Sequence, residues 1–313
     1  MRLLIDGRQL VFRCAVAQAD LTAEIGGEVV PTGGVFGFLT TLQQLIEEWS
    51  PNELVICWEG GIEFRRAISP DYKANRVKPD DEVAIAQRNE IMMQERVIKM
   101  LLARLGAGQA YAPSFEADDV LYTLAHQCKE RAVIYTADSD LLQAIRCGVA
   151  PVDCLRPIMG RETLVTYESF MEEHGFPPYR VLDVKALAGD KSDNVSGVPG
   201  IGKVWAEHFV RRYSNLEAMR DDAERRHNVE GVKLDGSTGA SPSKAESILA
   251  NWGAAERARA LVQLYTVEAD RMRWITPRKH AGKFRRYVSR LRMKTLLRAR
   301  PMATLERLEA LCP

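Results

Sequence analysis

Acidic residues stand where three short apolar runs of this sequence end. The runs finish as LLIDG, CWEGG and TADSD, and their acids are Asp6, Glu59, Asp138 and Asp140. If the runs are parallel strands of one sheet, their carboxyl ends meet at the edge where ligand sites form. A single acid after a strand is common, because Asp favours turns. Three strands that end alike instead predict a cluster of carboxylates.

A further acidic motif, SFEADD, is predicted to open a helix. Ser114 would cap this helix, and acids in its first turn would interact favourably with the helix dipole. Capping needs one or two acids, whereas this motif has three, namely Glu116, Asp118 and Asp119. Glu116 and Asp119 are three positions apart and share one helix face, from which they could reach the sheet edge. Capping and ligand binding both remain open for this motif.

The motif GDKSDN adds Asp190 and Asp193, for which a plain polar turn is the alternative. Carboxylates gathered without cations would repel one another and raise their own pKa values. Hard divalent ions remove that penalty, and oxygen ligands without His or Cys spacing favour Mg²⁺ or Mn²⁺ over zinc. Two such ions can activate a water and stabilise the attacking and leaving oxygens of a phosphodiester. The candidate metal ligands are Asp6, Glu59, Glu116, Asp118, Asp119, Asp138, Asp140, Asp190 and Asp193.

The glycine-rich segment GVPGIGK, residues 197–203, follows the last acidic motif and leads into a helical pattern. Closely spaced glycines permit a tight turn that brings backbone N–H groups near a phosphate, and the helix N-terminus adds its positive end. This is the helix–hairpin–helix pattern, which grips a phosphate backbone without reading bases. We therefore predict DNA contacts at Gly197, Gly200, Gly202 and Lys203, and K⁺ is a candidate ion for this turn.

The elements that must position these groups alternate between strands and helices. Helical periodicity covers Gly34–Glu48, Asp81–Leu105 and Ala117–Glu130, and a fourth apolar run, Val149–Val152, follows them. This alternation predicts an α/β domain with a mainly parallel sheet. From about Tyr167 the pattern is helical, apart from a polar Gly/Ser-rich segment at 227–243 that we expect to be a loop. We expect a catalytic domain at 1–170, a helix–hairpin–helix domain at 171–270 and a basic helical tail at 271–313.

The composition is that of an ordinary globular protein, with 46% hydrophobic and 27% charged residues in 313. No apolar run approaches the roughly 20 residues of a membrane helix, and an acid interrupts the N-terminal run too early for a signal peptide. The six cysteines are scattered without CxxC spacing, which favours reduced thiols and a cytoplasmic location. We therefore expect no membrane partner and a monomer.

The net charge of +1 conceals a strong segregation of charge. No Asp or Glu occurs between Arg271 and Thr304, and a second basic stretch runs from Arg65 to Arg104 with a few acids. Such segregation suggests a polyanion partner beside an acidic site. For the C-terminal run, a solvated basic face is an equally good interpretation.

Five motifs together resemble those of the 5′-nuclease superfamily, which includes flap endonucleases, the 5′-nuclease domain of bacterial DNA polymerase I and phage 5′-exonucleases. The motifs occur in order over roughly residues 1–215 as LLIDG, FRRAISPDYKANR, SFEADD, TADSD and GDKSDNVSGVPGIGK. The resemblance implies a PIN-like α/β core with a helical arch, here about residues 77–108, and a helix–three-turn–helix module. It also implies metal-dependent cutting near 5′ ends or junctions of branched DNA. No polymerase segment follows, which predicts a stand-alone nuclease of a phage or bacterium.

The resemblance also divides the acids between two metal ions. A first, more catalytic ion would be held by Asp6, Glu116, Asp118 and Asp138. A second would be held by Asp140, Asp190 and Asp193, with Asp119 near both.

Four residues of FRRAISPDYKANR are implied to contact DNA. Lys73 and Arg76 match the basic residues that meet the scissile phosphate, where a cation can stabilise charge developing on the phosphoryl oxygens. Arg65 is a further candidate contact, and Tyr72 could stack on a base or pack locally. Basic residues of the arch, such as Arg88, suit a single-stranded 5′ arm.

One departure from the family pattern concerns the second strand. Family members usually carry Asp at its end, six residues before the Phe of the FR motif, where this sequence has Trp58 followed by Glu59. Glu59 restores the ligand if its longer side chain reaches the site. If it does not, the alternative is an inactive or weak structure-specific DNA-binding protein of the same fold. An RNA-directed PIN-type nuclease is a third hypothesis, against which the helix–hairpin–helix motif argues.

Overall fold

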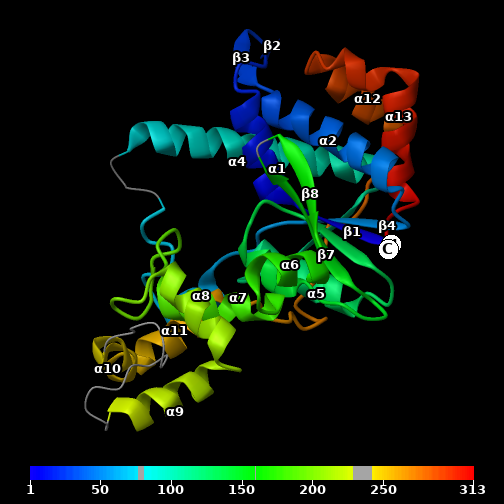
Figure 1. The fold of residues 1–313 in the computed structure, drawn as a ribbon. Coiled ribbons are helices and arrows are strands. Elements are labelled where there is room, and N and C mark those ends of the chain that lie inside the picture. The colour runs from blue at the N-terminus through cyan, green and yellow to red at the C-terminus, as the bar shows by residue number, and fades with distance from the viewer. Residues whose placement is uncertain (77–80, 159, 228–241) are drawn as a thin grey trace.

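The computed structural model describes residues 1–76, 81–158, 160–227 and 242–313. In these residues the main sheet has seven strands in the order β11-β5-β4-β1-β6-β7-β8 (Figure 1). Strands β5, β4, β1, β6 and β7 run parallel, whereas β8 and β11 close the two edges antiparallel. The strands are β1 Arg2–Asp6, β4 Glu53–Cys57, β5 Gly108–Tyr111, β6 Ala132–Tyr135, β7 Val152–Ile158, β8 Arg161–Val165 and β11 Arg273–Trp274.

The central strands are apolar throughout because both faces of the sheet are covered. Along β1, Leu4 packs into one hydrophobic core, while Leu3 and Ile5 pack into the other, as the two-residue repeat of a strand requires. One core is covered by α1 Gly7–Ala17, α2 Gly33–Trp49, α4 Glu82–Leu105, α12 Ala281–Arg290 and α13 Ala299–Glu306. The other is covered by α5 Ala117–Gln127, η1 Asp140–Ala144 and α6 Tyr167–His174.

A helical second domain follows the sheet and extends away from it, at the lower left of Figure 1. Its elements are η2 Pro178–Arg180, α7 Val181–Ala188, α8 Lys203–Arg212, α9 Leu216–His227, α10 Pro242–Ala250 and α11 Trp252–Val262. The short strands β9 Gly189–Asp190 and β10 Val195–Ser196 pair between α7 and α8. The hairpin of β2 Thr22–Ile25 and β3 Glu28–Pro31 links α1 to α2. The remaining short helices are α3 Glu63–Ile68, η3 Lys294–Leu297 and η4 Arg307–Glu309.

The mainly parallel sheet and its helices are as predicted, but two sequence predictions about elements were wrong. The fourth strand is not Val149–Val152: Val149 is fully exposed, and β7 begins only at Val152. Asp153 and Arg156 interrupt the apolar pattern of β7, and the structure compensates them with Arg131 and the carbonyl oxygen of Ala137. The charged side chains of Asp153 and Arg156 therefore hid this strand from a search for apolar runs.

The segment 271–313 is not a purely helical tail. Its β11 pairs with β5, and its helices α12 and α13 pack on α4 and α2. The expected loop at 228–241 and residues 77–80 of the expected arch lie outside the described residues.

No helix in the described ranges is long and apolar enough to cross a membrane. All six cysteines are free thiols. The reducing, cytoplasmic location stays a prediction.

Candidate active site

Hydrogen bonds around Asp6 connect the end of β1 to the end of β6. Asp6 caps α1 by accepting from the backbone N–H of Gln9 at 3.1 Å, and it accepts from the hydroxyl of Thr136 at 3.0 Å. The same hydroxyl accepts from the backbone N–H of Asp138 at 3.0 Å. Because β1 and β6 are parallel neighbours, these two acids lie at one edge of the sheet.

Glu59 joins this edge because the preceding tryptophan points the other way. Trp58 is fully buried, its ring 6.0 Å from that of Phe38 and its indole N–H donating to Gln109 at 3.1 Å. A Cβ at Gly7 would come within 2.6 Å of this ring, so the glycine of LLIDG makes room for it. Glu59 then accepts from the backbone N–H of Ala117 at 3.2 Å, at the start of α5.

The start of α5 is capped by acids and not by Ser114, which corrects the sequence prediction. Ser114 adopts a left-handed conformation, with a φ of 70°, two residues before the helix cap. Glu116 is the N-cap, and it forms a capping box with Asp119. Asp118 takes no part in that box and lies close enough to Asp138 and Asp6, at the strand ends, for their charges to act on it.

The acids of this edge act on one another electrostatically. Loss of hydration raises the pKa of Asp118 well above its usual range, and Asp138, Asp6 and Glu59 raise it further. The pKa of Asp6 is raised to about 7, first by burial and then by Glu59 and Asp138. Burial and the neighbouring Glu116 likewise raise the pKa of Glu59. The strand ends thus gather carboxylates whose charges oppose one another.

This arrangement fits a hard divalent cation. In the described residues no three acidic, histidine or cysteine side chains already surround one point as metal ligands do. The donors at hand are nevertheless all carboxylate oxygens, the kind that Mg²⁺ and Mn²⁺ prefer. The raised pKa of Asp6 and Asp118 marks negative charge that the protein itself leaves uncompensated.

Metal-free protein should lose stability as the pH rises from about 4 to about 7. The pKa of Asp6 is about 7 in the folded state, whereas an ordinary Asp in the unfolded chain has a pKa near 3.8. Between these two values the folded state therefore binds more protons than the unfolded state. Added Mg²⁺ should oppose the loss, and more strongly at high pH, because ligands bind metal when deprotonated. Thermal unfolding with chelator and with Mg²⁺ across this range measures both effects. A melting temperature that rises with pH in chelator would contradict the predicted charge cluster.

A second acidic group lies beside the first and is held by Lys185. The ammonium of Lys185 pairs with Asp140 and lies 2.8 Å from Asp190. Burial alone would raise the pKa of Asp190, but hydrogen bonds from Lys185 and Ser192 outweigh burial and lower this pKa to about 2. Asp193, the third acid expected here, is buried near Lys73 and Arg76 instead of Lys185.

The turn containing Lys73 is joined to the loop GDKSDN by backbone contacts. The N–H of Lys73 donates to the carbonyl of Asp193 at 2.9 Å, and Asn194 donates to the carbonyl of Asp71 at 2.8 Å. Asn75 donates to the carbonyl of Lys191 at 2.7 Å. Lys73 itself adopts a φ of 57°, a conformation that is held by surrounding structure when it occurs at functional sites.

Lys73 and Arg76 extend from this turn to the acids. The ammonium of Lys73 pairs with Glu116 and lies 3.4 Å from Asp193, while Arg76 lies 2.6 Å from Asp193. Burial opposes the charge of Lys73, but Glu116 and Asp193 outweigh it and raise its pKa. Both cations are therefore charged beside the carboxylates.

Arg65 is not a surface residue, so its predicted contact with DNA is wrong. Its side chain is 4% exposed and forms two bonds with Asp119, at 2.6 and 2.9 Å. It also donates to the carbonyls of Leu261 and Gln263, both at 2.8 Å. Asp119 accepts in addition from the N–H of Tyr265 at 2.9 Å. The oxygens predicted as metal ligands in Asp119 instead hold α3, α5 and the end of the second domain together.

Tyr72 is also buried, which excludes the predicted stacking on a base. The residue is 3% exposed, and its hydroxyl lies 2.8 Å from Glu116 and 3.0 Å from Asp193. Burial and then these two acids raise the pKa of Tyr72, so the phenol stays protonated. Tyr72 packs locally and donates a hydrogen bond to the acids. Local packing was the alternative interpretation of this residue.

Replacing Arg65 with Ala should lower the free energy of unfolding by about 3–5 kcal/mol, because the buried Asp119 loses its partner. Urea unfolding measures the change. Arg66→Ala is the matched control, since Arg66 is exposed on the same helix and a surface change costs about 0.5 kcal/mol or less. Equal stability of the two variants would contradict the structural role of Arg65.

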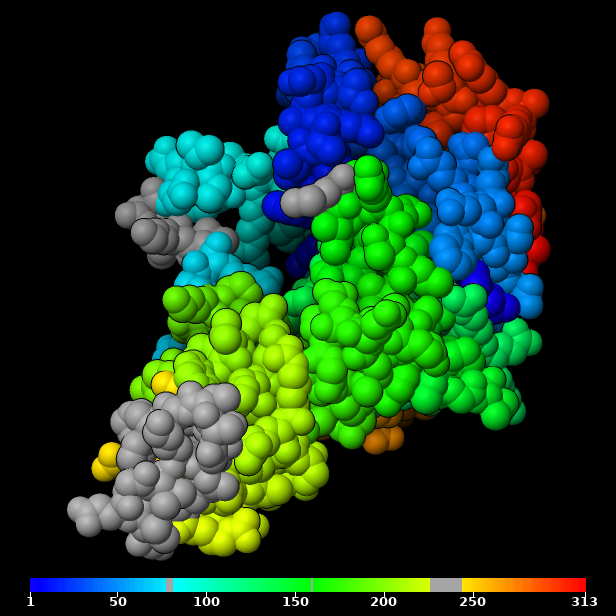
Figure 2. Space-filling model, in the orientation of Figure 1, coloured from blue at the N-terminus to red at the C-terminus, as the bar shows by residue number. Residues whose placement is uncertain are grey.

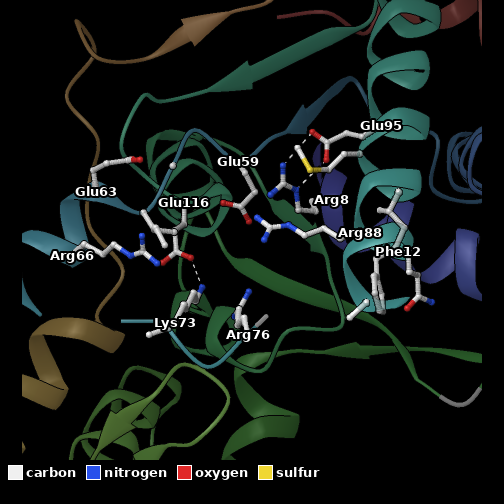
Figure 3. Close-up of a pocket in the computed structure, with 17 residues that line it drawn as sticks. Arg8, Phe12, Glu59, Glu63, Arg66, Lys73, Arg76, Arg88, Glu95 and Glu116 are labelled. Carbon is white, nitrogen blue, oxygen red and sulfur yellow. Dashed lines mark hydrogen bonds and ion pairs between the residues drawn. The ribbon is translucent and has the colours of Figure 1, made fainter. Parts of the chain in front are cut away.

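A cavity of about 670 Å³ opens between the acids and α4 (Figure 3). Glu59 and Glu116 line one side of it, and Lys73, Arg76 and Arg88 also line it. In Figure 3, Arg88 extends from α4 toward Glu59. Figure 2 shows the molecular surface hollowed beside the N-terminal part of α4, drawn in cyan.

Two cavity residues of α1 were missed by sequence reasoning. Arg8 lines the cavity and forms an ion pair with Glu95 of α4 at 3.0 Å. Phe12 lines its outer part and is 54% exposed. A large aromatic on the polar face of an amphipathic helix was the available signal for Phe12, because α1 buries Leu10, Val11 and Cys14 but not position 12.

The glycine-rich segment forms the connection between α7 and α8. A Cβ at Gly197 would lie 2.3 Å from the backbone nitrogen of Gly189, so only glycine fits the close approach of the two strands. Gly200 has a φ of 78°, and Gly202 is the N-cap of α8. Lys203 is exposed. The turn and the helix N-terminus thus face solvent as the motif predicts.

Two family descriptions together cover most of the chain. Residues 1–175 match "5′-3′ exonuclease, N-terminal resolvase-like domain", and residues 176–274 match "5′-3′ exonuclease, C-terminal SAM fold". This chain belongs to the 5′-3′ exonuclease family. The 5′-nuclease superfamily and the two-part fold expected from the sequence are confirmed.

Relatives of this 5′-3′ exonuclease include other 5′-3′ exonucleases and DNA polymerases I. The 5′-3′ exonuclease of Bacillus subtilis is 36% identical over 224 residues, which are 70% of this chain and 73% of that protein. The thermostable DNA polymerase I of Thermus thermophilus is 31% identical over 94% of this chain but only 32% of the polymerase.

Among solved structures, the exonuclease chain has the fold of phage T5 5′-exonuclease with bound zinc. The two share 19% identity and a TM-score of 0.65, over 84% of this chain and 90% of that one. T5 flap endonuclease in a complex with DNA and metal ions aligns over 98% and 99% of the two chains, with 18% identity and a TM-score of 0.64.

Proposed function

We propose that this exonuclease is a divalent-metal-dependent, structure-specific 5′-nuclease, a flap endonuclease and 5′-3′ exonuclease. It would hydrolyse phosphodiester bonds near 5′ ends or junctions of branched DNA. One observation carries the proposal: a single cavity is lined by Glu59 and Glu116 and by the cations Lys73, Arg76 and Arg88. The acids would hold metal ions there, while the cations would bind the negatively charged phosphate.

The residues that would hold the metal ions fall into two groups. Asp6, Glu59, Asp118 and Asp138 form the first group, with Glu116 at its margin beside Lys73. Asp140 and Asp190 form the second group, with Asp193 between the two. The chemistry supplied by a pair of Mg²⁺ or Mn²⁺ ions is the activation of a water and the stabilisation of the leaving oxygen.

The protein's own cations would position and stabilise the scissile phosphate. Lys73 and Arg76 extend from a turn that is fixed to GDKSDN, so their charges are placed before substrate binds. A preorganised cation beside a phosphoryl oxygen stabilises the charge that develops in the transition state. Arg88 and Phe12 are suited to a single-stranded 5′ arm, since an arginine meets its phosphates and an exposed aromatic ring stacks on its bases.

The T5 structures support this assignment, since one is a 5′-exonuclease with bound divalent metal ions and another is a flap endonuclease in a complex with DNA and metal ions. GVPGIGK would grip the duplex backbone, with K⁺ as a candidate ion at its turn. We propose that the protein acts as a monomer.

Cleavage of a 5′-labelled flap duplex tests the proposal. We expect nicking near the junction with Mg²⁺ or Mn²⁺, none with chelator, and strong loss in Asp138→Asn. The variant Asp153→Asn, in an ion pair with Arg131 away from the cavity, is the matched control and should still cut. Tight binding of flap DNA without cleavage under either metal would favour the inactive alternative, and preference for an RNA flap would favour the RNA-directed one.

Glu59→Gln distinguishes a working ligand from a bystander in the same assay. Glu59 lies among the acids, and the negative charge of Glu116 raises its pKa. We therefore expect the variant to need a higher Mg²⁺ concentration for half-maximal cleavage. Glu63→Gln is its control, since Glu63 lines the same cavity but lies outside the acidic edge. An unchanged Mg²⁺ requirement in Glu59→Gln would remove this residue from the proposed ligand set.

A further inference from the structure

The C-terminal basic segment is a folded part of the nuclease domain. The matched family description ends at residue 274, so nearly all of this segment, 271–313, lies beyond it. Its helix α12 buries Phe284 and Val288 completely in the core that α2 and α4 share. The N–H groups of Arg278 and His280 donate to carbonyls at the end of α4, at 2.8 and 2.9 Å. The segment is therefore firmly attached to the helix that borders the cavity.

The opposite face of α12 presents unpaired cations to solvent. Lys283, Arg286 and Arg290 are exposed, with Tyr287 between them. Their spacing of three and four residues places them on one side of the helix. Within the residues that the structure describes, none of the three has an acidic partner.

Neighbouring cations of the same segment are neutralised, which sets this face apart. Lys279 pairs with Glu309, Arg285 lies 3.2 Å from Glu306, and Arg300 lies 2.7 Å from Glu47. Arg292, Lys294 and Arg298 are exposed and continue the positive surface beyond α12. We refer to Lys283, Arg286, Tyr287 and Arg290 as the α12 face.

The α12 face lies away from the cavity and from GVPGIGK. The cavity is lined by α4 from Ala84 to Glu95, whereas the residues that lead into α12 meet the end of α4 at Ala103 and Arg104. At 1.5 Å per residue Arg104 lies about 14 Å along α4 from Glu95 and about 24 Å from Arg88. Figure 1 shows α12 at the upper right and the second domain at the lower left, with the sheet between them, and in Figure 2 the orange and the yellow-green parts of the chain lie at these opposite ends.

We propose that the α12 face binds the sugar–phosphate backbone of a second duplex arm, on the side of the cavity opposite GVPGIGK. The proposal rests on the proposed function, and it adds a contact outside both matched family regions. The three cations rise about 10 Å along the helix, which spans about three phosphates of one strand at 3.4 Å each. A tyrosine among cations suits a nucleic acid, because it offers both a hydrogen-bond donor and a flat face. Held there, a duplex would reach the part of the cavity at Arg88 over roughly seven base pairs.

Binding of junction DNA in chelator tests the proposal without requiring cleavage. The test variant is Lys283→Gln/Arg286→Gln/Arg290→Gln. The matched control is Lys279→Gln/Arg285→Gln/Arg300→Gln, which removes the same charge from the ion-paired cations of the same segment. Fluorescence anisotropy across a salt series gives the affinity and its salt dependence. Melting temperatures of both variants establish that they are folded.

The test variant should bind more weakly and lose up to about 2.7 from the slope of log K against log salt, about 0.9 per lost phosphate contact. The control should keep most of the parental slope. Trimming one duplex arm to roughly five base pairs, short of the α12 face, should abolish the difference between parent and test variant, and trimming the other arm should not.

An equal loss in both triple variants, or a difference that survives trimming of either arm, would overturn the proposal. Unchanged DNA binding by both variants would also overturn it and leave an acidic protein as the partner of this face. Failure of the proposed function is seen separately, as absence of Mg²⁺-dependent cleavage by the parent protein.

Discussion

Replacing Asp118 with Asn should slow cleavage by about 10²–10³-fold and, at the same time, raise the melting temperature of the metal-free protein. Loss of a carboxylate from the metal-holding edge removes charge stabilisation of the kind worth about 10²–10³ in rate for a single group. Without metal the same carboxylate is a liability, because Asp138, Asp6 and Glu59 all oppose its charge. Neutral asparagine removes that repulsion.

Single-turnover cleavage of the flap substrate and thermal unfolding in chelator at about pH 8 measure the two effects. Asp153→Asn is the control, since it removes a carboxylate that pairs with Arg131 at 2.7 Å. It should keep near-parental cleavage, because its carboxylate lies outside the acidic edge. Mg²⁺ should stabilise the parent more than Asp118→Asn, because a ligand that binds only the folded state raises its stability. An Asp118→Asn protein that is slower but also less stable in chelator would contradict the proposed repulsion.

Replacing Lys73 with Met should slow cleavage by about 10²–10³-fold, with little change in the affinity for DNA measured in chelator. The ammonium sits among Glu116, Asp193 and the ring of Tyr72. From there it would act on the reacting phosphate and not on the duplex arms. Methionine keeps much of the length of the side chain, so the change is mainly one of charge.

The same variant should be less stable than the parent in chelator, because the buried Glu116 and Asp193 lose a cation. Lys129→Met, an exposed lysine at the far end of α5, should leave both cleavage and stability unchanged. Lys73→Met and Asp118→Asn therefore share a catalytic defect but shift metal-free stability in opposite directions. A large loss of DNA affinity in Lys73→Met would instead make Lys73 a binding residue.

The sequence allowed prediction of the acidic edge because each part of it is local. Strand-end acids such as Asp6 and Asp138 follow apolar runs, and parallel pairing brings such ends together without further information. The sequence suggested Glu59 as a metal ligand but did not show whether its side chain reaches the acidic edge. Its position depends on the burial of Trp58 against Phe38, a contact between β4 and α2 that no spacing reveals.

The mistakes concern charged or polar groups that the fold buries. Arg65 and Tyr72 stand in a basic motif and look like surface residues, yet each contacts elements that are distant in sequence, such as Leu261 and Asp193. Asp119 appeared to be a ligand because its neighbours are acids, but its oxygens are taken by Arg65 and Tyr265. Such pairings require the tertiary structure, since composition tells only that a group is charged.

The return of the C-terminal segment to the first domain has a consequence for how the protein is made. The core beneath α2 and α4 is sealed by residues as late as Leu305 and Leu308, while the first family region ends at residue 175. At roughly 5–20 residues per second of synthesis, about 7–27 s separate the emergence of these two points from a ribosome. During this interval the nascent catalytic half exposes an apolar surface, to which chaperones can bind until the C-terminal segment covers it. A chain stopped near residue 274 would keep that surface and should aggregate, although it would contain every carboxylate of the site.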